Sequence, residues 1–205
     1  MLQTRKRPIA RLRETVMPIS VVKPTRAELD RCVARFRDLE RCDTGLPDMQ
    51  LPESRRAFLN VLGFSQPKAP GQYSPFGDMA PAAVSHLKAG FGISFIAARP
   101  GCGVSMHTHD TVETFLVISG KWKLEWELDT GPDFAILEPL DFMACPIGVQ
   151  RRFECVESAP DKDEGLILGI IAGESPAAEA SPAAIRRLVE AGIFTPEQAQ
   201  AALGA

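Results

Sequence analysis

The sequence predicts a mainly β protein: a small antiparallel β-barrel or jelly roll, with a helix near the N-terminus and short helices near the C-terminus. Three observations indicate this fold class. Polar and apolar residues alternate through the middle of the chain, which is the period of half-buried strands. Turn-forming residues are frequent, with 16 Gly and 17 Pro among 205 residues. Helix-capping patterns occur near the two ends.

Composition excludes several classes of protein. Charged residues make up 24% of the chain and apolar residues 45%, as in ordinary globular proteins. The longest apolar run, 166–172, is much shorter than the roughly 18 residues that suggest a membrane span, and the N-terminus lacks the apolar centre of a secretory signal. The five Cys are odd in number and lack CxxC spacing. We therefore expect a cytoplasmic protein with reduced thiols and no membrane contact.

The first residues differ in charge from the rest of the chain. Residues 1–16 contain five basic side chains and one acidic one, so their net charge is +4. The whole chain has a net charge of −3, which leaves −7 for the remainder. We expect this segment to be a disordered basic arm or a wrongly assigned start. An acidic remainder argues against binding to nucleic acid.

Residues 17–84 are predicted to form a helix followed by a Pro-rich extension. Thr25 and Glu28 make a capping box, and apolar residues then recur at three- and four-residue spacing to about Arg41. This pattern predicts an amphipathic helix. Six Pro between residues 43 and 83 leave room only for short elements and loops. We expect the extension to pack on the barrel or on a partner chain.

Residues 85–175 carry the strand signals. The clearest segment is 121–128 (KWKLEWEL), where Trp and Leu alternate with Lys and Glu. Similar short runs, separated by turn sequences, are expected at 91–98, 104–109, 113–118, 134–138, 142–145, 150–156 and 165–172. About eight short strands at this spacing predict a barrel or jelly roll.

The C-terminal segment, 176–205, is predicted to be helical. Ser181-Pro182 and Thr195-Pro196 each combine a capping residue with a Pro at the first helical position. These starts predict two short helices, around 186–191 and 197–202.

The candidate site begins with the histidines, of which the chain has three. His107 and His109 are two residues apart, so in a strand their imidazoles lie on the same face. Glu113 follows a tight turn and is expected to begin the antiparallel partner strand. Two imidazoles and one carboxylate from adjacent strands are the ligands of a facial metal site that leaves positions open on the ion.

The same segment resembles a known family. The pattern Gly-x5-His-x-His-x3-Glu-x6-Gly over 101–120 is similar, at every fixed position, to the first motif of the cupin superfamily, whose RmlC-like members are single barrels. The segment 140–155 resembles the second cupin motif in three positions and departs from it in three. The matching residues are Asp141, Pro146 and Gly148, and the departures are Leu140, Arg151 and Cys155. The resemblance covers roughly 85–175 and implies a cupin barrel.

Arg151 is the departure with chemical consequences. The resemblance implies a metal held by three His and one Glu, and Arg151 stands where the last His is expected. A guanidinium stays protonated and cannot bind a cationic metal. Arg151 shares the strand parity of the apolar Phe153 and Cys155, so its side chain is expected to point inward. An inward Arg requires an anionic partner.

Three arrangements follow from this departure. In one, Arg151 pairs permanently with Glu113 and the protein binds no metal. In another, His107, His109 and Glu113 hold a divalent metal, with Fe(II) expected and Mn, Ni or Zn as alternatives, while Arg151 binds a substrate carboxylate in bidentate fashion. In the third, His86 supplies the missing imidazole.

Three functions are compatible with these arrangements. The resemblance implies a metal-dependent enzyme with dioxygenase, isomerase or decarboxylase chemistry on a small molecule. A dioxygenase-like reaction on a carboxylate substrate would use Arg151 and Glu113 as catalytic residues. A non-catalytic cupin that binds or senses a small anion through Arg151 is the alternative. The third possibility is a scaffold that mainly forms a homodimer, and we expect a homodimer in each case.

Overall fold

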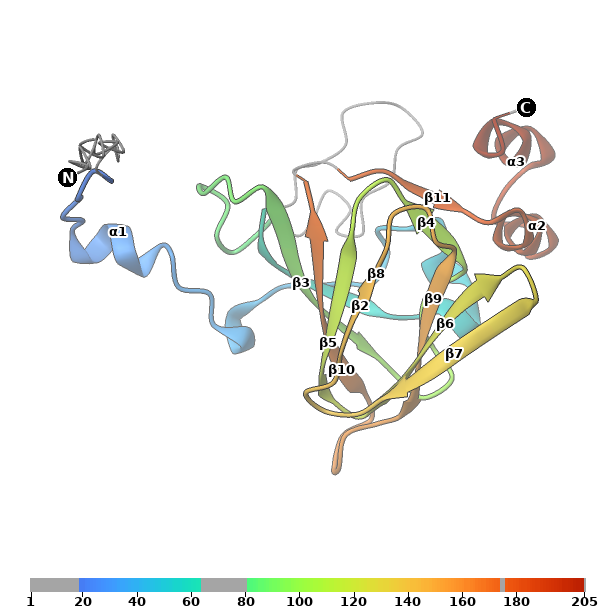
Figure 1. Cartoon of the computed structure of the whole chain (residues 1–205), viewed down its shortest axis with the longest axis horizontal. Helices are drawn as coiled ribbons and strands as arrows, with labels where there is room; N and C mark the ends of the chain where they lie inside the picture. The colour runs from blue at the N-terminus through green and yellow to red at the C-terminus, as the bar shows by residue number, and fades with distance from the viewer. Residues whose placement is uncertain (1–18, 64–80, 174–175, 205) are drawn as a thin grey trace, which may run out of the picture.

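The computed structural model describes residues 19–63, 81–173 and 176–204, and within them the chain forms two antiparallel sheets (Figure 1). The larger sheet has six strands, in the order β1 (Arg41–Cys42), β2 (Ala57–Leu62), β3 (Phe91–Ala98), β10 (Gly165–Ala172), β5 (Glu113–Ser119) and β8 (Phe142–Cys145). The smaller sheet has five, in the order β11 (Ala178–Ala180), β4 (His107–His109), β9 (Arg151–Glu157), β6 (Lys121–Leu128) and β7 (Gly131–Leu137). The predicted fold class is confirmed, as a two-sheet jelly roll whose sheets do not close into one barrel.

The core lies between the two sheets. Phe115 of β5 and Phe153 of β9 pack edge to face across it, with ring centroids 5.2 Å apart. Trp122 of β6 adds a second edge contact with Phe153, at 5.8 Å, and is fully buried. Its indole N–H donates to the carbonyl oxygen of Ser119, so the ring is buried without an unpaired donor. The alternation in 121–128 therefore directs Trp122 and Leu124 into the core, as predicted.

Three strands were not expected from the pattern. β2 lies inside the Pro-rich extension and pairs with β3 in the larger sheet. Its first four residues are all buried, so the run AFLN shows no alternation to mark it as a strand. β1 has two residues, and β11 is an exposed Ala-Glu-Ala segment that is held by backbone pairing with β4.

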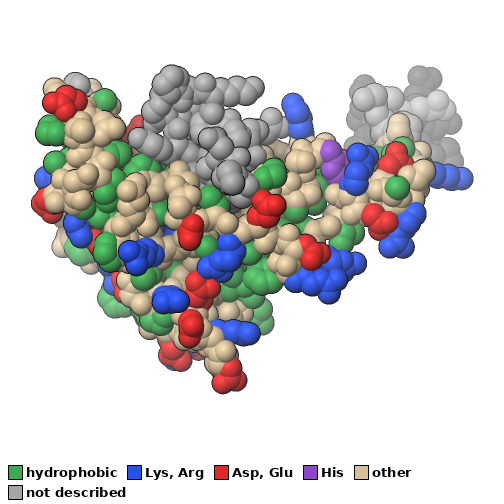
Figure 2. Space-filling view, turned by 180° about the vertical axis from the view of Figure 1, so that it is seen from behind, with side chains coloured by type: hydrophobic (Ala, Val, Ile, Leu, Met, Phe, Trp, Pro, Cys, Tyr) green, Lys and Arg blue, Asp and Glu red, His purple; other side chains and the backbone are tan. Residues whose placement is uncertain are grey.

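The N-terminal helix is much shorter than predicted. α1 spans Arg26–Asp30, begins at the expected Thr25 capping box, and is followed only by a single 3-10 turn, η1 (Phe36–Asp38). Leu29 and Val33, which would form the apolar face of a longer helix, are about half exposed. Short helices need tertiary burial for stability, and this segment projects away from the sheets (Figure 1). Acidic and basic side chains are mixed along it on the face that Figure 2 shows.

Both C-terminal helices follow their predicted caps, although the first of them begins four residues before the predicted range of 186–191. α2 (Pro182–Glu190) and α3 (Pro196–Ala202) follow Ser181 and Thr195, whose hydroxyls accept backbone N–H bonds from the first turn. α2 packs beside the 3-10 turn η2 (Pro47–Gln50) through a second apolar cluster, in which Leu51, between η2 and η3 (Pro52–Ser54), meets Ile185 and Leu188. Among the described residues, no helix is both long and apolar enough to cross a membrane.

Candidate metal centre

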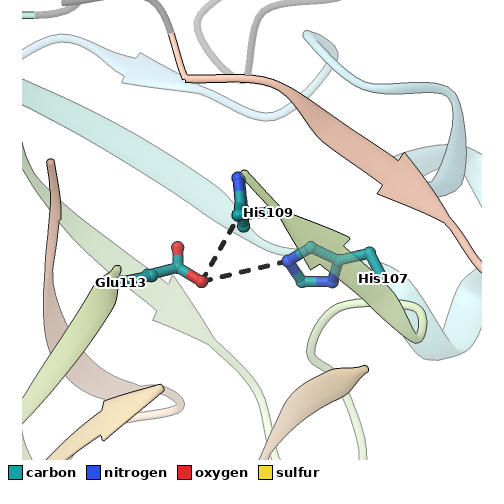
Figure 3. A group of neighbouring side chains, drawn as sticks. All are labelled: His107, His109 and Glu113. Atoms are coloured by element: carbon teal, nitrogen blue, oxygen red, sulfur yellow. Dashed lines mark ion pairs between the residues drawn. The ribbon is translucent and has the colours of Figure 1, made fainter. Parts of the chain in front are cut away.

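His107, His109 and Glu113 meet between the two sheets (Figure 3). The two imidazoles come from β4 of the smaller sheet and the carboxylate from the first residue of β5 in the larger one. Glu113 Oε2 lies 4.0 Å from Nε2 of His107 and 3.7 Å from Nε2 of His109. One ligand atom from each residue lies within 4.8 Å of the others. The three side chains are mostly buried, with 10 to 13% of their surface exposed.

The sequence-based expectation that Glu113 begins the partner strand of β4 is wrong. β4 pairs with β11 and β9, whereas β5 pairs with β10 and β8. The link between them crosses from one sheet to the other and is hydrogen-bonded at both ends. Asp110 Oδ1 accepts the N–H of Ala177, which precedes β11, and the carbonyl oxygen of Val112 accepts the N–H of Ala172 at the end of β10. The carboxylate therefore faces the imidazoles across the space between the sheets.

Backbone carbonyls orient both imidazoles. Nδ1 of His107 donates to the carbonyl oxygen of Ser105, at 2.8 Å, and Nδ1 of His109 donates to that of Ala177, at 2.9 Å. A carbonyl oxygen can only accept, so each Nδ1 carries a proton, and in a neutral ring each Nε2 then carries the lone pair. Both Nε2 atoms face Glu113 (Figure 3). Metal-binding His residues have this hydrogen-bond pattern in general.

Burial keeps these imidazoles neutral. It lowers the pKa of His107 to about 4, although the charge of Glu113 opposes part of that change. Burial lowers the pKa of His109 as well. Both rings are therefore unprotonated at neutral pH, which is the form that binds a metal. The neighbouring Cys145, opposite Glu113 in the β5–β8 register, is kept a neutral thiol because burial raises its pKa to about 11.

Arg151 lies beside Glu113 and points inward, as its strand parity predicts. It is the first residue of β9, pairs with His107 in register, and is 1% exposed. Its Nη2 and Nε donate to Glu113 Oε2 at 2.8 and 3.2 Å, and Nη1 donates to the carbonyl of Val149 at 3.3 Å. The carboxylate oxygen nearest the imidazoles is therefore also the one bound by the guanidinium.

The three side chains fit a divalent ion. Metal bonds of about 2.0–2.2 Å place neighbouring ligand atoms about 3.0–3.5 Å apart. The two His–Glu separations of 3.7 and 4.0 Å need only a small contraction, and the ligand atoms of the two imidazoles lie within 4.8 Å of each other. Two nitrogen lone pairs and one carboxylate oxygen form the facial set that leaves positions open.

His86 does not join this group. It lies on an exposed segment outside β4 and β5, with its Nε2 3.5 Å from Sγ of Cys32. Sequence reasoning also missed Ser105 and Ala177, which orient the two rings. No signal would have revealed them, because every residue has a carbonyl oxygen and only the fold selects which one meets a ring.

Comparisons with protein-family models and with curated proteins give no match. Comparison with solved structures gives many, among them a sugar phosphate isomerase from the cupin superfamily of Silicibacter pomeroyi, with 17% identity, a TM-score of 0.48, and coverage of 72% of this chain and 80% of that one. Vicilin from Corylus avellana is 14% identical (TM-score 0.47; 85% and 47% covered), and oxalate decarboxylase from Lactobacillus farciminis is 9% identical (TM-score 0.49; 80% and 41% covered). The chain spans less than half the length of the last two.

Proposed function

We propose that this jelly roll, with its complete first cupin motif, is a metal-dependent, dioxygenase-like enzyme acting on a small carboxylate substrate. His107, His109 and Glu113 hold a divalent transition metal, with Fe(II) expected and Mn, Ni or Zn as alternatives. Arg151 orients the substrate. The single observation that carries the proposal is the pair of Nδ1 hydrogen bonds, because they direct two buried Nε2 lone pairs toward one carboxylate.

The alternative partners for these lone pairs are poor. Glu113 Oε2 is 3.7 and 4.0 Å from the two Nε2 atoms, which is beyond hydrogen-bond distance. Neither imidazole is protonated at neutral pH, so neither forms a true ion pair with Glu113. Among the described residues, no side chain donates a hydrogen bond to either Nε2. A cation satisfies both nitrogens and the carboxylate together.

Charge balance links the metal to an anionic substrate. The negative charge of Glu113 and the positive charge of Arg151 cancel, and the two imidazoles are neutral. A divalent ion would therefore leave a mostly buried site with excess positive charge, which an anion offsets. Arg151 has five N–H donors, and its bonds to Glu113 and Val149 use three of them. Donors remain for a carboxylate.

The chain's own residues supply the surroundings for the reaction. An Fe(II) ion in a two-His, one-carboxylate site supplies open positions for dioxygen and a chelating substrate. Arg151 fixes the orientation of the substrate carboxylate through its planar fork of donors. The low exposure of His107, His109 and Glu113 limits the access of water. Arg151 Nη2 lies 2.8 Å from Glu113 Oε2, so the guanidinium offsets the negative charge of this carboxylate.

The ion pair between Arg151 and Glu113 favours a second candidate. If that pair is permanent, the carboxylate is not available to a metal, and the protein is a metal-free module that binds or senses a small anion through Arg151. The two candidates differ in metal content and in the role of Arg151, which orients a substrate beside the metal in the first and is paired with Glu113 in the second. Both are open to direct measurement.

Metal content separates the two candidates. The chain is purified without a His tag, supplied separately with Fe(II), Mn(II), Ni(II) or Zn(II), and examined by elemental analysis. We expect about one ion per chain for the wild type, the same for the control His86→Ala, and loss of the ion in His107→Ala and His109→Ala. Substoichiometric metal with all four ions would contradict the proposal.

Anion binding tests the role of Arg151. Arg151→Lys keeps the positive charge but loses the bidentate fork. The neighbouring Arg152→Lys is a matched control, since Arg152 binds Glu125 with the opposite strand parity. Small carboxylates are expected to raise the melting temperature of the metal-loaded wild type and of Arg152→Lys, and to have a clearly smaller effect on Arg151→Lys. Equal effects on all three chains would exclude Arg151 as the anchor.

A further inference from the structure

We propose that Asp48 and Asp110 are positioning residues of this site. Each carboxylate accepts a hydrogen bond from the backbone N–H of another residue, and the carbonyl oxygen of that residue orients one of the two imidazoles. The inference rests on the proposed function and deepens it, because it names the residues that keep the Nε2 atoms of His107 and His109 directed at the metal position.

The first of these connections serves His109. Its Nδ1 donates to the carbonyl oxygen of Ala177 at 2.9 Å, and the N–H of Ala177 donates to Oδ1 of Asp110, also at 2.9 Å. The N–H of Asp110 returns to the same carbonyl oxygen at 3.4 Å. Ala177 is exposed and directly precedes β11. Asp110 therefore fixes an otherwise surface residue against the ring.

The second connection serves His107. Its Nδ1 donates to the carbonyl oxygen of Ser105 at 2.8 Å, and the N–H of Ser105 donates to Oδ2 of Asp48 at 3.1 Å. Asp48 is itself held by two bonds of 3.0 and 3.1 Å from the buried Arg56, which also donates to the carbonyl of Gly103. Asp48 lies in η2, more than fifty residues before the ring that it supports.

The two connections have the same chemical order: carboxylate, N–H, carbonyl, imidazole. They come from different parts of the chain, one from η2 and one from the link between β4 and β5, so a single turn motif does not explain both. Hydrogen bonds to a carboxylate are roughly twice as strong as neutral ones. Fixing residues 105 and 177 in this way also fixes which ring nitrogen carries the proton, and so which one is left for a metal.

The predicted effect is on metal affinity and on the ring tautomer. Loss of the group that directly orients a ligand imidazole typically weakens metal binding 10- to 100-fold. Asp110 acts one hydrogen bond further out, so we expect Asp110→Ala to weaken Zn(II) binding about tenfold. Asp110→Asn keeps an oxygen that accepts the N–H of Ala177 and is expected to stay close to the wild type.

A structural role for Asp110 alone would not change the tautomer. Nitrogen NMR of the metal-free full chain, above the ordinary His pKa of about 6.5, reports which nitrogen of each ring is protonated. With three His in the chain, His86→Ala leaves only the two rings of the site. We expect the Nδ1–H form for both rings in the wild type, and a mixture of the two tautomers for His109 in Asp110→Ala.

Asp141 provides a matched control. Its Oδ2 accepts the backbone N–H of Glu138 at 2.9 Å, as Asp110 does for Ala177, but Glu138 contacts neither imidazole. Asp141→Ala should keep wild-type Zn(II) affinity and tautomers. For Asp48, the double variant Asp48→Ala, Arg56→Met removes both charges of the buried pair, and Asp48→Asn keeps an acceptor for Ser105 and should restore the wild-type His107 tautomer.

The outcomes separate this inference from the proposed function. If the wild type binds no Zn(II), the proposed function is contradicted. The tautomers of His107 and His109 in the metal-free protein still test whether Asp48 and Asp110 position the two rings. Unchanged Zn(II) affinity and unchanged Nδ1–H signals in Asp110→Ala would overturn the role of Asp110. The same result in the Asp48 double variant would overturn that of Asp48, and failure of Asp48→Asn to restore the His107 tautomer would do so equally.

Discussion

Acidification of the metal-free protein should remove stability that depends on His107. Burial lowers the pKa of this imidazole in the folded protein to about 4, compared with 6.5 for an unperturbed His. Between pH 6.5 and pH 4, the imidazole of His107 is therefore protonated in the unfolded chain and mostly unprotonated in the folded protein. The stability is complete above about pH 6.5 and is lost as the pH falls toward 4. One pKa unit corresponds to about 1.4 kcal/mol, so the loss is about 3 kcal/mol.

Urea unfolding at a series of pH values measures this loss. His107→Gln replaces the imidazole by a group that does not titrate, so its stability should fall about 3 kcal/mol less than that of the wild type across the same range. His86→Ala removes an exposed imidazole outside the group and should keep the full acid-induced loss. The reasoning is refuted if His107→Gln and the wild type lose the same free energy of unfolding between pH 6.5 and 4.

Three further predictions concern the surroundings of the site. Arg151→Met leaves the mostly buried Glu113 without its cation and should reduce the free energy of unfolding by about 3–5 kcal/mol, most of which the double variant with Glu113→Leu recovers; denaturant titration of the wild type and the two variants checks this. The thiol of Cys145 is buried and should not react with a thiol reagent until the protein unfolds. If Cys145 of the folded protein reacts as fast as an exposed thiol, its placement is contradicted. The exposed apolar side chains of the 19–40 segment predict association through this segment into a homodimer; sedimentation at micromolar concentration should show a dimer that deletion of the segment converts to a monomer, and a monomeric full chain would oppose the prediction.

Alternation predicts strands well where one face is buried and the other is solvated. β6 is the best example, since Trp122 and Leu124 enter the core while Lys123 and Glu125 form ion pairs on the outer face. β2 was missed because consecutive residues are buried, and β11 because nothing in Ala-Glu-Ala distinguishes a strand. The helix predicted to Arg41 shows the opposite error: a sequence can be amphipathic where the fold offers no surface for its apolar face.

More of the candidate site than of the surrounding helices and strands could be predicted from the sequence. Spacing on one strand brings His107 and His109 together, and parity directs Arg151 inward to Glu113. Which sheet holds Glu113 was not predictable, because a three-residue link permits either a hairpin or a crossing. The residues that orient the rings were hidden for another reason: they act through backbone groups, and their carboxylates come from positions 48 and 110.

Anomalous X-ray scattering from a crystal of the metal-loaded protein, recorded at the absorption edge of the bound ion, tests the central claim most directly. The account predicts one peak within bonding distance of Nε2 of His107, Nε2 of His109 and a carboxylate oxygen of Glu113, with Arg151 beside the ion and not bound to it. A crystal grown with excess metal that shows no peak there, and in which Arg151 still binds Glu113 as in the present structure, would contradict it.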